Sequence, residues 1–453
     1  MSAFRAPDRD PDHLSPGATT LESGLGGIRS AFASRNFRVF WVGNLTHTIT
    51  VWVNRMAVGW LTWELTHSAA WLGIMAAANM IPIVFLGPVG GVTADRFGHR
   101  FQLVTATYIG GVIAAIMAAL VAADSLSIEP MLILVTLSGI TRAFNVPARI
   151  ALIHALVERR HLSSAIGIHS ATFYGGNFVG PALGGLLITS FGIAPAFFAY
   201  AAGELIAATS FLLLRVTQKR AADKRGSGMF EDFLAGFRYT MRHAGILSLM
   251  ILTAINSVFL QPYMDMLPGF ASEVFHRGAG GLALLTSATG AGAMFGGLWV
   301  ARRGRVEGLV RIQLTALTLG VGAMIAFVAT SNLIASMGAL FFVGFCLVTA
   351  QVCGSTLMQI TVASELRARV LSFNGVINAS GPALGAICIG WAATKLGLRL
   401  PVGASALLAL VCLLAAARLV LRNASAMETH GESEPQAAGH PQAGKEGVRR
   451  QSV

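Results

Sequence analysis

The sequence predicts an all-α, polytopic membrane protein with twelve transmembrane helices in two pseudo-symmetric six-helix halves. Of its 453 residues, 54% are hydrophobic and only 12% are charged, about half the charged fraction of a soluble domain. Apolar stretches of roughly 20 residues recur from end to end, and each is long enough to cross a bilayer core of about 30 Å. Helices are expected because barrel strands would instead alternate apolar and polar residues over short segments.

The expected spans are separated by loops of unequal charge. Basic residues gather in the loops after even-numbered spans, as Arg96 and Arg100 do, and we also count Arg149 as a loop residue after the fourth span. The positive-inside rule then places both termini in the cytoplasm. The twelve expected spans are 37–63, 70–93, 101–123, 130–151, 165–190, 193–215, 243–267, 280–301, 308–329, 332–357, 370–394 and 399–421.

The chain also contains an internal repeat. Gly-Pro-Ala-Leu-Gly-Gly at 180–185 returns as Gly-Pro-Ala-Leu-Gly-Ala at 381–386, which is the pattern of two related halves. We expect a cytoplasmic N-terminal tail at 1–34, an N-terminal half at 35–217, a cytoplasmic linker at 218–242, a C-terminal half at 243–422 and a disordered cytoplasmic tail at 423–453.

The charge and the cysteine positions argue against nucleic-acid binding, a disulfide framework and a metal site. The formal net charge of +12 would suggest nucleic acid in a soluble protein, but here the positive-inside rule accounts for it, so no nucleic-acid partner is expected. All four cysteines fall inside apolar spans, and they predict neither a disulfide framework nor a metal site.

A charged turn between the second and third spans is the most specific motif. It places Gly91, Asp95, Arg96, Gly98 and Arg100 where the chain leaves the membrane and re-enters it. The turn, the two halves and the basic central segment together resemble the major facilitator superfamily over residues 35–422. Within the superfamily the chain resembles the transmembrane secretion effector branch, which contains the enterobactin exporter and Tap-type efflux pumps. The residues that carry this resemblance are 56–61, 64–66, Pro82, 87–88, Phe144, 147–149, 267–268, 365–367 and 369–370.

The resemblance assigns the turn a gating role. It implies that Asp95 latches the two halves on the cytoplasmic side, against the start of the eleventh span near Val370, when the central cavity faces outward. A carboxylate is favoured at such a helix N-terminus, and Gly91 and Gly98 would permit close approach and the turn. The copy at 296–305 has Ala301 in place of the acid. The alternative is an ordinary capped turn with positive-inside charges.

The fifth span carries a second motif. Gly176, Gly180, Pro181, Gly184 and Gly185 give a flat helix face that lets another backbone approach, with a proline that can kink the span. They resemble the motif that the superfamily associates with proton-antiporting exporters. Simple tight packing is the alternative.

Polar residues inside the spans are the candidates for lining a cavity. A charge in hydrocarbon costs several kcal/mol unless it is paired or wetted, and the superfamily builds its central cavity from spans one, four, seven and ten. Arg142 lies well inside its span and would bind an anionic group or modulate a nearby acid. The cavity candidates are His47, Asn54, Arg55, Arg142, Asn145, Asn256, Tyr263, Gln351 and Ser355.

Two acids are candidates for carrying protons. Glu204 is the only acid deep inside a span, which makes it a natural protonation site. Span six is peripheral in the superfamily, however, and this favours a structural role for Glu204. Asp265 lies nearer the outer end of span seven.

These observations predict a monomeric secondary transporter of the inner membrane. We expect it to export a drug-like or siderophore-like small molecule by alternating access, in exchange for protons. Proton-coupled uptake is the alternative, and a transport-inactive sensor or a membrane enzyme comes after it. Neither a Walker loop nor a His-Glu-x-x-His sequence is present, so we expect no ATP, no cofactor and no metal, with the proton gradient as the energy source.

Overall fold

A computed structural model of the protein describes residues 32–157, 161–215, 229–362 and 364–429. These residues are helical and contain no strand, which confirms the all-α class. The first group of helices comprises α2 (Arg35–Thr66), α3 (Ala69–Phe97), α4 (His99–Ala122), α5 (Ile128–Leu156), α6 (Leu162–Phe191) and α7 (Ala194–Leu212). The second comprises α8 (Met229–Arg242), α9 (Ala244–Ile255), η2 (Asn256–Leu260), α10 (Tyr263–Gly269), η3 (Phe270–Val274), α11 (Gly278–Arg303), α12 (Leu309–Ala329), α13 (Leu333–Thr361), α14 (Ser364–Leu396) and α15 (Arg399–Thr429).

The described helices are long enough for a membrane protein. Ten segments have both the length and the apolar composition to cross a bilayer, with Ala244–Val274 acting as one of them. The helices α2 and α6 are not among the ten, although they contain 32 and 30 residues and a span needs only about 20. Both carry polar side chains along their length, and these lower their hydropathy.

The segment from Ala244 to Val274 departs from the straight seventh span expected from hydropathy. Two wide π-helical turns, η2 and η3, flank the short helix α10. Gln261 N donates to Asn256 O at 2.9 Å, and Phe275 N donates to Phe270 O at 3.0 Å. Pro262, which lacks an N–H, lies two residues after the first π turn, so the regular ladder is interrupted there.

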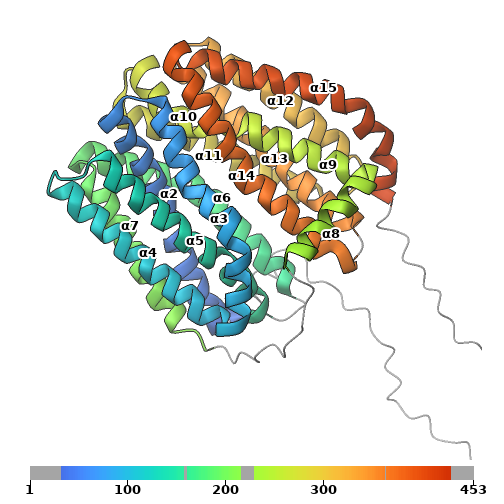
Figure 1. Cartoon of the computed structure of the whole chain (residues 1–453), viewed down its shortest axis with the longest axis horizontal. Helices are drawn as coiled ribbons and strands as arrows, with labels where there is room; N and C mark the ends of the chain where they lie inside the picture. Colours follow the sequence, from blue (N-terminus) through green and yellow to red (C-terminus); the bar gives the residue numbers. More distant parts are fainter. Residues whose placement is uncertain (1–31, 158–160, 216–228, 363, 430–453) are drawn as a thin grey trace, which may run out of the picture.

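The two groups of helices stand side by side. Figure 1 shows α2–α7, drawn from blue to green, next to the yellow-to-red helices of the second group. The groups meet where α14 packs along α3 and where α11 packs along α6. The helix α8 packs on α14 and α9, so part of the expected linker, from Met229 to Arg242, is helical. Residues 216–228 lie outside the described residues.

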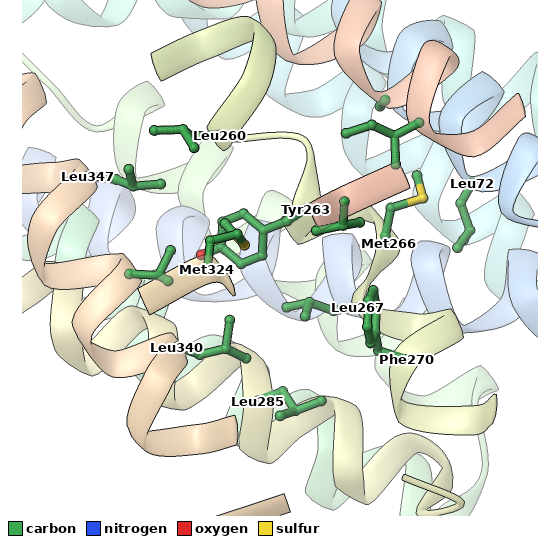
Figure 2. Close-up of a cluster of buried hydrophobic side chains, with 14 of the residues drawn as sticks. Leu72, Leu260, Tyr263, Met266, Leu267, Phe270, Leu285, Met324, Leu340 and Leu347 are labelled. Atoms are coloured by element: carbon green, nitrogen blue, oxygen red, sulfur yellow. The ribbon is translucent and has the colours of Figure 1, made fainter. Parts of the chain in front are cut away.

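The two ends of the bundle differ in how the groups meet. Near the α2–α3 turn, the hydrophobic core runs continuously from the first group into the second, and it includes Trp60, Leu72, Met266 and Leu285. Figure 2 shows Leu72 beside Met266, with Leu267 and Phe270 between them and Leu285. We call this the closed end.

The opposite end, which carries Gly98, is called the open end. There the first group has a separate core of its own, built from α2–α7. Glycines that face a neighbour at the closed end are close-packed: a Cβ on Gly73 would collide with the Ala386 carbonyl, and one on Gly390 would collide with Ala69. Toward the open end, a Cβ on Gly91 of α3 or Gly375 of α14 would meet no atom within 4 Å. The two groups are therefore joined at the closed end.

The last helix extends past the expected boundary at Arg422 and continues to Thr429. The carboxylate of Glu428 accepts hydrogen bonds from the backbone N–H groups of Gly308 at 2.8 Å and Val310 at 3.1 Å. It thereby caps the start of α12, where free amide groups favour a carboxylate. Residues 430–453 of the expected disordered tail, like 1–31 of the N-terminal tail, lie outside the described residues.

Candidate functional site

A buried polar cluster lies inside the first group of helices. The His47 Nδ1 atom on α2 lies 2.7 Å from the Glu204 Oε1 atom on α7, and both side chains are almost fully buried, at 9% and 2% exposure. Arg149 on α5 contacts the other ring nitrogen of His47, Nε2, through Nη2. Three helices thus contribute one basic, one imidazole and one acidic group to a single row.

The contact with Arg149 determines which ring nitrogen of His47 carries the proton. A guanidinium carries only N–H donors and stays charged in proteins. The His47 Nε2 atom must therefore accept from Arg149, and the single ring proton must sit on Nδ1, the nitrogen that lies on the Glu204 side. In this arrangement His47 is neutral. An additional proton has no lone pair on His47 to bind unless Arg149 moves away.

Arg149 corrects a prediction made from the sequence, which placed it in a loop. The helix α5 continues to Leu156 and carries Arg149 inside the bundle. Its Nε atom donates to Asn145 Oδ1 at 3.1 Å, and Asn145 Nδ2 in turn donates to Thr107 Oγ1 at 2.8 Å. The spacing of Arg142, Asn145 and Arg149, at i, i+3 and i+7, was the available signal, because these positions share a helix face.

Glu204 points into the bundle although it belongs to the sixth helix. The helix α7 packs against α2 and α4, and a Cβ on Gly111 of α4 would lie 3.2 Å from the Glu204 Cβ. The absence of a side chain at Gly111 lets α7 approach there. Tyr200 lies one helical turn before Glu204 and is also buried.

A second charged contact joins the two groups of helices. Arg55 Nη2 on α2 donates to Asp265 Oδ1 on α10 at 2.9 Å. The guanidinium also lies over the Trp52 ring, 5.4 Å from its centroid. This ion pair lies on the closed-end side of His47 along α2, so one of the two predicted proton carriers, Asp265, is bound across the interface between the groups.

Arg142 lies at the middle of α5. Its Nη1 atom donates to Asn79 Oδ1 on α3 at 2.6 Å, and its side chain is half-buried. The sequence did not single out Asn79. The close approach that makes this bond comes from Gly139, one turn earlier, where a Cβ would lie 2.6 Å from the Asn79 carbonyl oxygen. Asn54 is half-buried on α2.

The predicted cavity residues of the second group carry neutral side chains. Asn256 Nδ2 donates to Gln351 Oε1 at 3.4 Å, which joins η2 to α13. Ser355 Oγ donates to the Gln351 carbonyl at 2.8 Å. Tyr263 on α10 is buried among apolar neighbours, as Figure 2 shows.

The glycine stripe of α6 packs as its spacing predicts. A Cβ on Gly176 would lie 2.7 Å from Thr48 Cγ2, one on Gly180 would collide with Trp52, and one on Gly184 would lie 3.3 Å from the Met56 sulfur. These three contacts all lie on α2, the helix that carries His47. Gly185 instead faces Ala283 of α11, and Pro181 lies inside α6.

The repeat in the second half packs in the corresponding way. A Cβ on Gly381 of α14 would lie 2.6 Å from Ser257 Cβ, and one on Gly385 would collide with the Val258 carbonyl. Both neighbours belong to η2. The repeated Gly-Pro-Ala-Leu-Gly sequence therefore produces the same kind of close helix contact in both groups.

The charged turn at 91–100 lies at the open end. Gly98 adopts φ of 101° and Gly304, in the second copy, adopts 62°, a region that favours glycine. Asp95 is 68% exposed and lies 3.6 Å from His99, whereas Arg100 Nε donates to the Phe211 carbonyl at 3.3 Å and so caps α7. Arg96 lies over the Phe97 ring. The predicted latch between Asp95 and α14 concerns the opposite facing and stays a prediction.

Comparison with known proteins gives the same class as the fold. The model of the transmembrane secretion effector family matches residues 28–443. The multidrug efflux pump Tap of Mycobacterium tuberculosis (strain ATCC 25618 / H37Rv) is 27% identical over 376 residues, which cover 79% of this chain and 88% of Tap. The staphyloferrin A transporter of Staphylococcus aureus (strain NCTC 8325 / PS 47) is 25% identical over 248 residues, 54% of this chain and 59% of that protein.

Solved structures show the same fold. A bacterial homologue of the human lysosomal transporter Spinster, in an inward-facing and unoccupied conformation, matches with a TM-score of 0.67 at 17% identity, over 88% of this chain and 99% of that chain. A D-xylose–proton symporter matches with a TM-score of 0.63 at 14% identity, over 86% and 97%. The fold and the family match together define a polytopic membrane transporter of the major facilitator type, and not an enzyme.

Within that class the family is also clear. Because the family model covers nearly the whole chain, this protein belongs to the transmembrane secretion effectors.

Proposed function

We propose that this protein exports a small molecule across the inner membrane in exchange for protons. The similarity to the Tap multidrug efflux pump supports export, and the similarity to the staphyloferrin A transporter supports a small-molecule cargo. In this proposal α2 and α6 also cross the bilayer, which gives twelve spans, and both termini lie in the cytoplasm. The open end then faces the cytoplasm, so the structure corresponds to the state that receives cargo from inside the cell.

The contact between His47 and Glu204 is the observation that supports proton coupling. The two groups lie 2.7 Å apart in the interior. Burying an ionisable pair in a membrane protein costs free energy, and such pairs usually mark functional sites. The charged and titratable groups around it are Arg142 and Arg149 on α5, Tyr200 on α7, and His169 on α6, whose Nδ1 lies 3.3 Å from Asn44 Nδ2.

Arg149 supplies a physical link between protonation and helix movement. Arg149 and an incoming proton compete for the same lone pair, the one on His47 Nε2. A proton that binds His47 must take this lone pair, so Arg149 must leave, and its departure removes a contact between α5 and α2. Protonation of His47 therefore weakens one helix arrangement and deprotonation restores it, which is the requirement for coupling a proton to alternating access.

Transport into everted membrane vesicles tests this proposal. Vesicles that contain the protein are energised with a proton gradient, and the uptake of ethidium, rhodamine 123, carboxyfluorescein and candidate siderophores is measured. We expect uptake of at least one compound to collapse when the gradient is dissipated, and to be absent with Glu204→Gln.

The matched control is Asp265→Asn, which removes the other interior acid of the proposal. It should keep gradient-dependent uptake, because Asp265 is bound to Arg55 at the interface. Gradient-dependent uptake by Glu204→Gln at the wild-type rate would contradict coupling through this pair. Accumulation of the same compounds by intact cells on overexpression would instead support import.

A further inference from the structure

The positive charge of Arg142 lies deep in the membrane interior. Arg142 stands midway along α5, which runs from Ile128 to Leu156, and its side chain is half-buried. This depth is the farthest from either headgroup region, so its guanidinium cannot reach the interface as a residue near a helix end does.

The other interior arginines are matched by acids. Arg55 pairs with Asp265 at 2.9 Å, and Arg149 belongs to the row that ends on Glu204. Arg142 contacts the neutral amide oxygen of Asn79. Within the part of the chain that the structure describes, no carboxylate lies within 4 Å of Arg142. The interior thus has one positive charge more than its ion pairs neutralise.

Among the residues that the structure describes, Arg142 donates a hydrogen bond through Nη1 alone, and its Nε and Nη2 atoms have no protein partner. The bond to Asn79 Oδ1 uses Nη1. The edge formed by Nε and Nη2 is the one that binds a carboxylate with two parallel hydrogen bonds. Asn79 therefore acts as a positioning residue that holds the guanidinium in one orientation, while a second set of donors is available to a ligand.

Among the described residues of the second group, the cavity candidates that contact α13 carry neutral polar side chains. Asn256 donates to Gln351 Oε1, so the Gln351 amide nitrogen is left with its own two N–H donors. Amide donors favour an oxygen-rich ligand without neutralising its charge.

We infer that the transported molecule carries a carboxylate or a similar oxyanion, which binds to the Nε and Nη2 edge of Arg142. This inference rests on the proposed transport function, and it narrows the cargo from any amphipathic compound to an anionic one. The competing role for Arg142 is purely electrostatic action on Glu204, and the test below separates the two.

Binding to the purified protein in detergent tests the inference without a proton gradient. Two pairs of probes with matched skeletons are titrated and their Kd values measured: carboxyfluorescein against rhodamine 123, and 1-naphthoate against 1-naphthylmethylamine. We expect the anionic member of at least one pair to bind about tenfold or more tightly, the size of a charge-assisted hydrogen bond. Arg142→Gln should remove this preference, and Arg142→Lys should keep part of it.

The matched control is the double variant Arg55→Gln with Asp265→Asn, because it removes an interior arginine together with the acid that neutralises it. It should leave the ratio of the two Kd values unchanged, while Asn79→Ala should reduce it a few-fold with Arg142 intact. The inference is wrong if no anionic probe binds more tightly than its cationic partner, or if Arg142→Gln leaves the ratio as in the wild type. A purely electrostatic role on Glu204 would give this last result. If binding is selective for anions but transport does not depend on the proton gradient, the proposed proton coupling is wrong and the inference about the cargo still holds.

Discussion

The two groups of helices are built alike but differ in the chemistry of their interiors. In each, a glycine-rich helix packs closely on the first segment of its group: Gly180 on α2 and Gly381 on η2. The first group places His47, Arg142, Arg149 and Glu204 in its interior. The second group places amides there, together with Asp265, whose carboxylate is paired with Arg55 across the interface. The repeated sequence thus preserves the packing, while the buried His47–Glu204 contact belongs to one half.

This difference separates two demands on a transporter. Both groups must rotate as rigid bodies about their contacts, so both need close-packed helices. A proton site needs only one location, and a second buried charge would add a desolvation cost without adding a proton. In the proposed mechanism, movement therefore involves both groups, and proton coupling involves the first.

Neutralising Glu204 should have the largest effect. Glu204→Gln keeps the size of the side chain but removes the ionisable carboxyl group that His47 faces, so gradient-driven uptake into vesicles should fall to the level of vesicles without the protein. The same substitution of the second group's acid, Asp265→Asn, should retain most of the uptake. Equal losses from both would remove the contrast between the two groups.

Adding a methyl group to the paired glycines should test their common packing. Gly180→Ala and Gly381→Ala should each destabilise the protein by about 1–3 kcal/mol, the usual cost of overpacking, measured as a lower melting temperature in detergent. Gly175→Ala is the control on the same helix as Gly180, because its Cβ would meet nothing within 4 Å. If Gly180→Ala lowers the melting temperature and Gly381→Ala does not, the two contacts are not equivalent.

Asp95→Asn should slow transport without changing stability. Its carboxylate is 68% exposed in this conformation, so the melting temperature should not move. Loss of a charge–dipole contact in the opposite facing should lower the vesicle uptake rate about twofold to fivefold. The second copy of the turn already has Ala301 at this position, and Ala301→Asp is the converse variant. Unchanged uptake by Asp95→Asn would make the turn an ordinary capped turn.

The smallest effect is expected from the amides of the second group. The Asn256–Gln351 hydrogen bond is long, at 3.4 Å, and a bond of this length contributes little. Gln351→Ala should therefore change the vesicle uptake rate less than about threefold. A loss as large as that of Glu204→Gln would place essential chemistry in the second group as well.

Hydropathy and repetition carried most of the information about the fold. The expected span 70–93 corresponds to α3 (Ala69–Phe97), and the expected span 399–421 lies within α15 (Arg399–Thr429). Apolar length predicts such helices because the bilayer requires it. Hydropathy does not register a π turn, since the apolar composition continues through Asn256–Leu260 while the hydrogen-bond ladder changes.

Most residues of the candidate cluster were singled out from the sequence one by one, but not as a cluster. His47 and Glu204 were both singled out, yet the sequence gives the face of each helix and not which helices are neighbours. Glu204 was weighed as peripheral because of its place in the chain order, and its contact with His47 depends on how α7 packs on α2. Arg149 was placed in a loop because charge near an expected span end was attributed to topology.

The two π-helical turns around α10 give one part of the chain an unusual tolerance to changes in length. A single-residue deletion in an α-helical span rotates every later side chain by about 100°, because the helix has 3.6 residues per turn. A π turn closes its hydrogen bond over five residues and thus already holds one residue beyond the α-helical repeat. Deleting Val258 from η2 would let that turn close as an ordinary α-helix while Tyr263 and Asp265 keep their places.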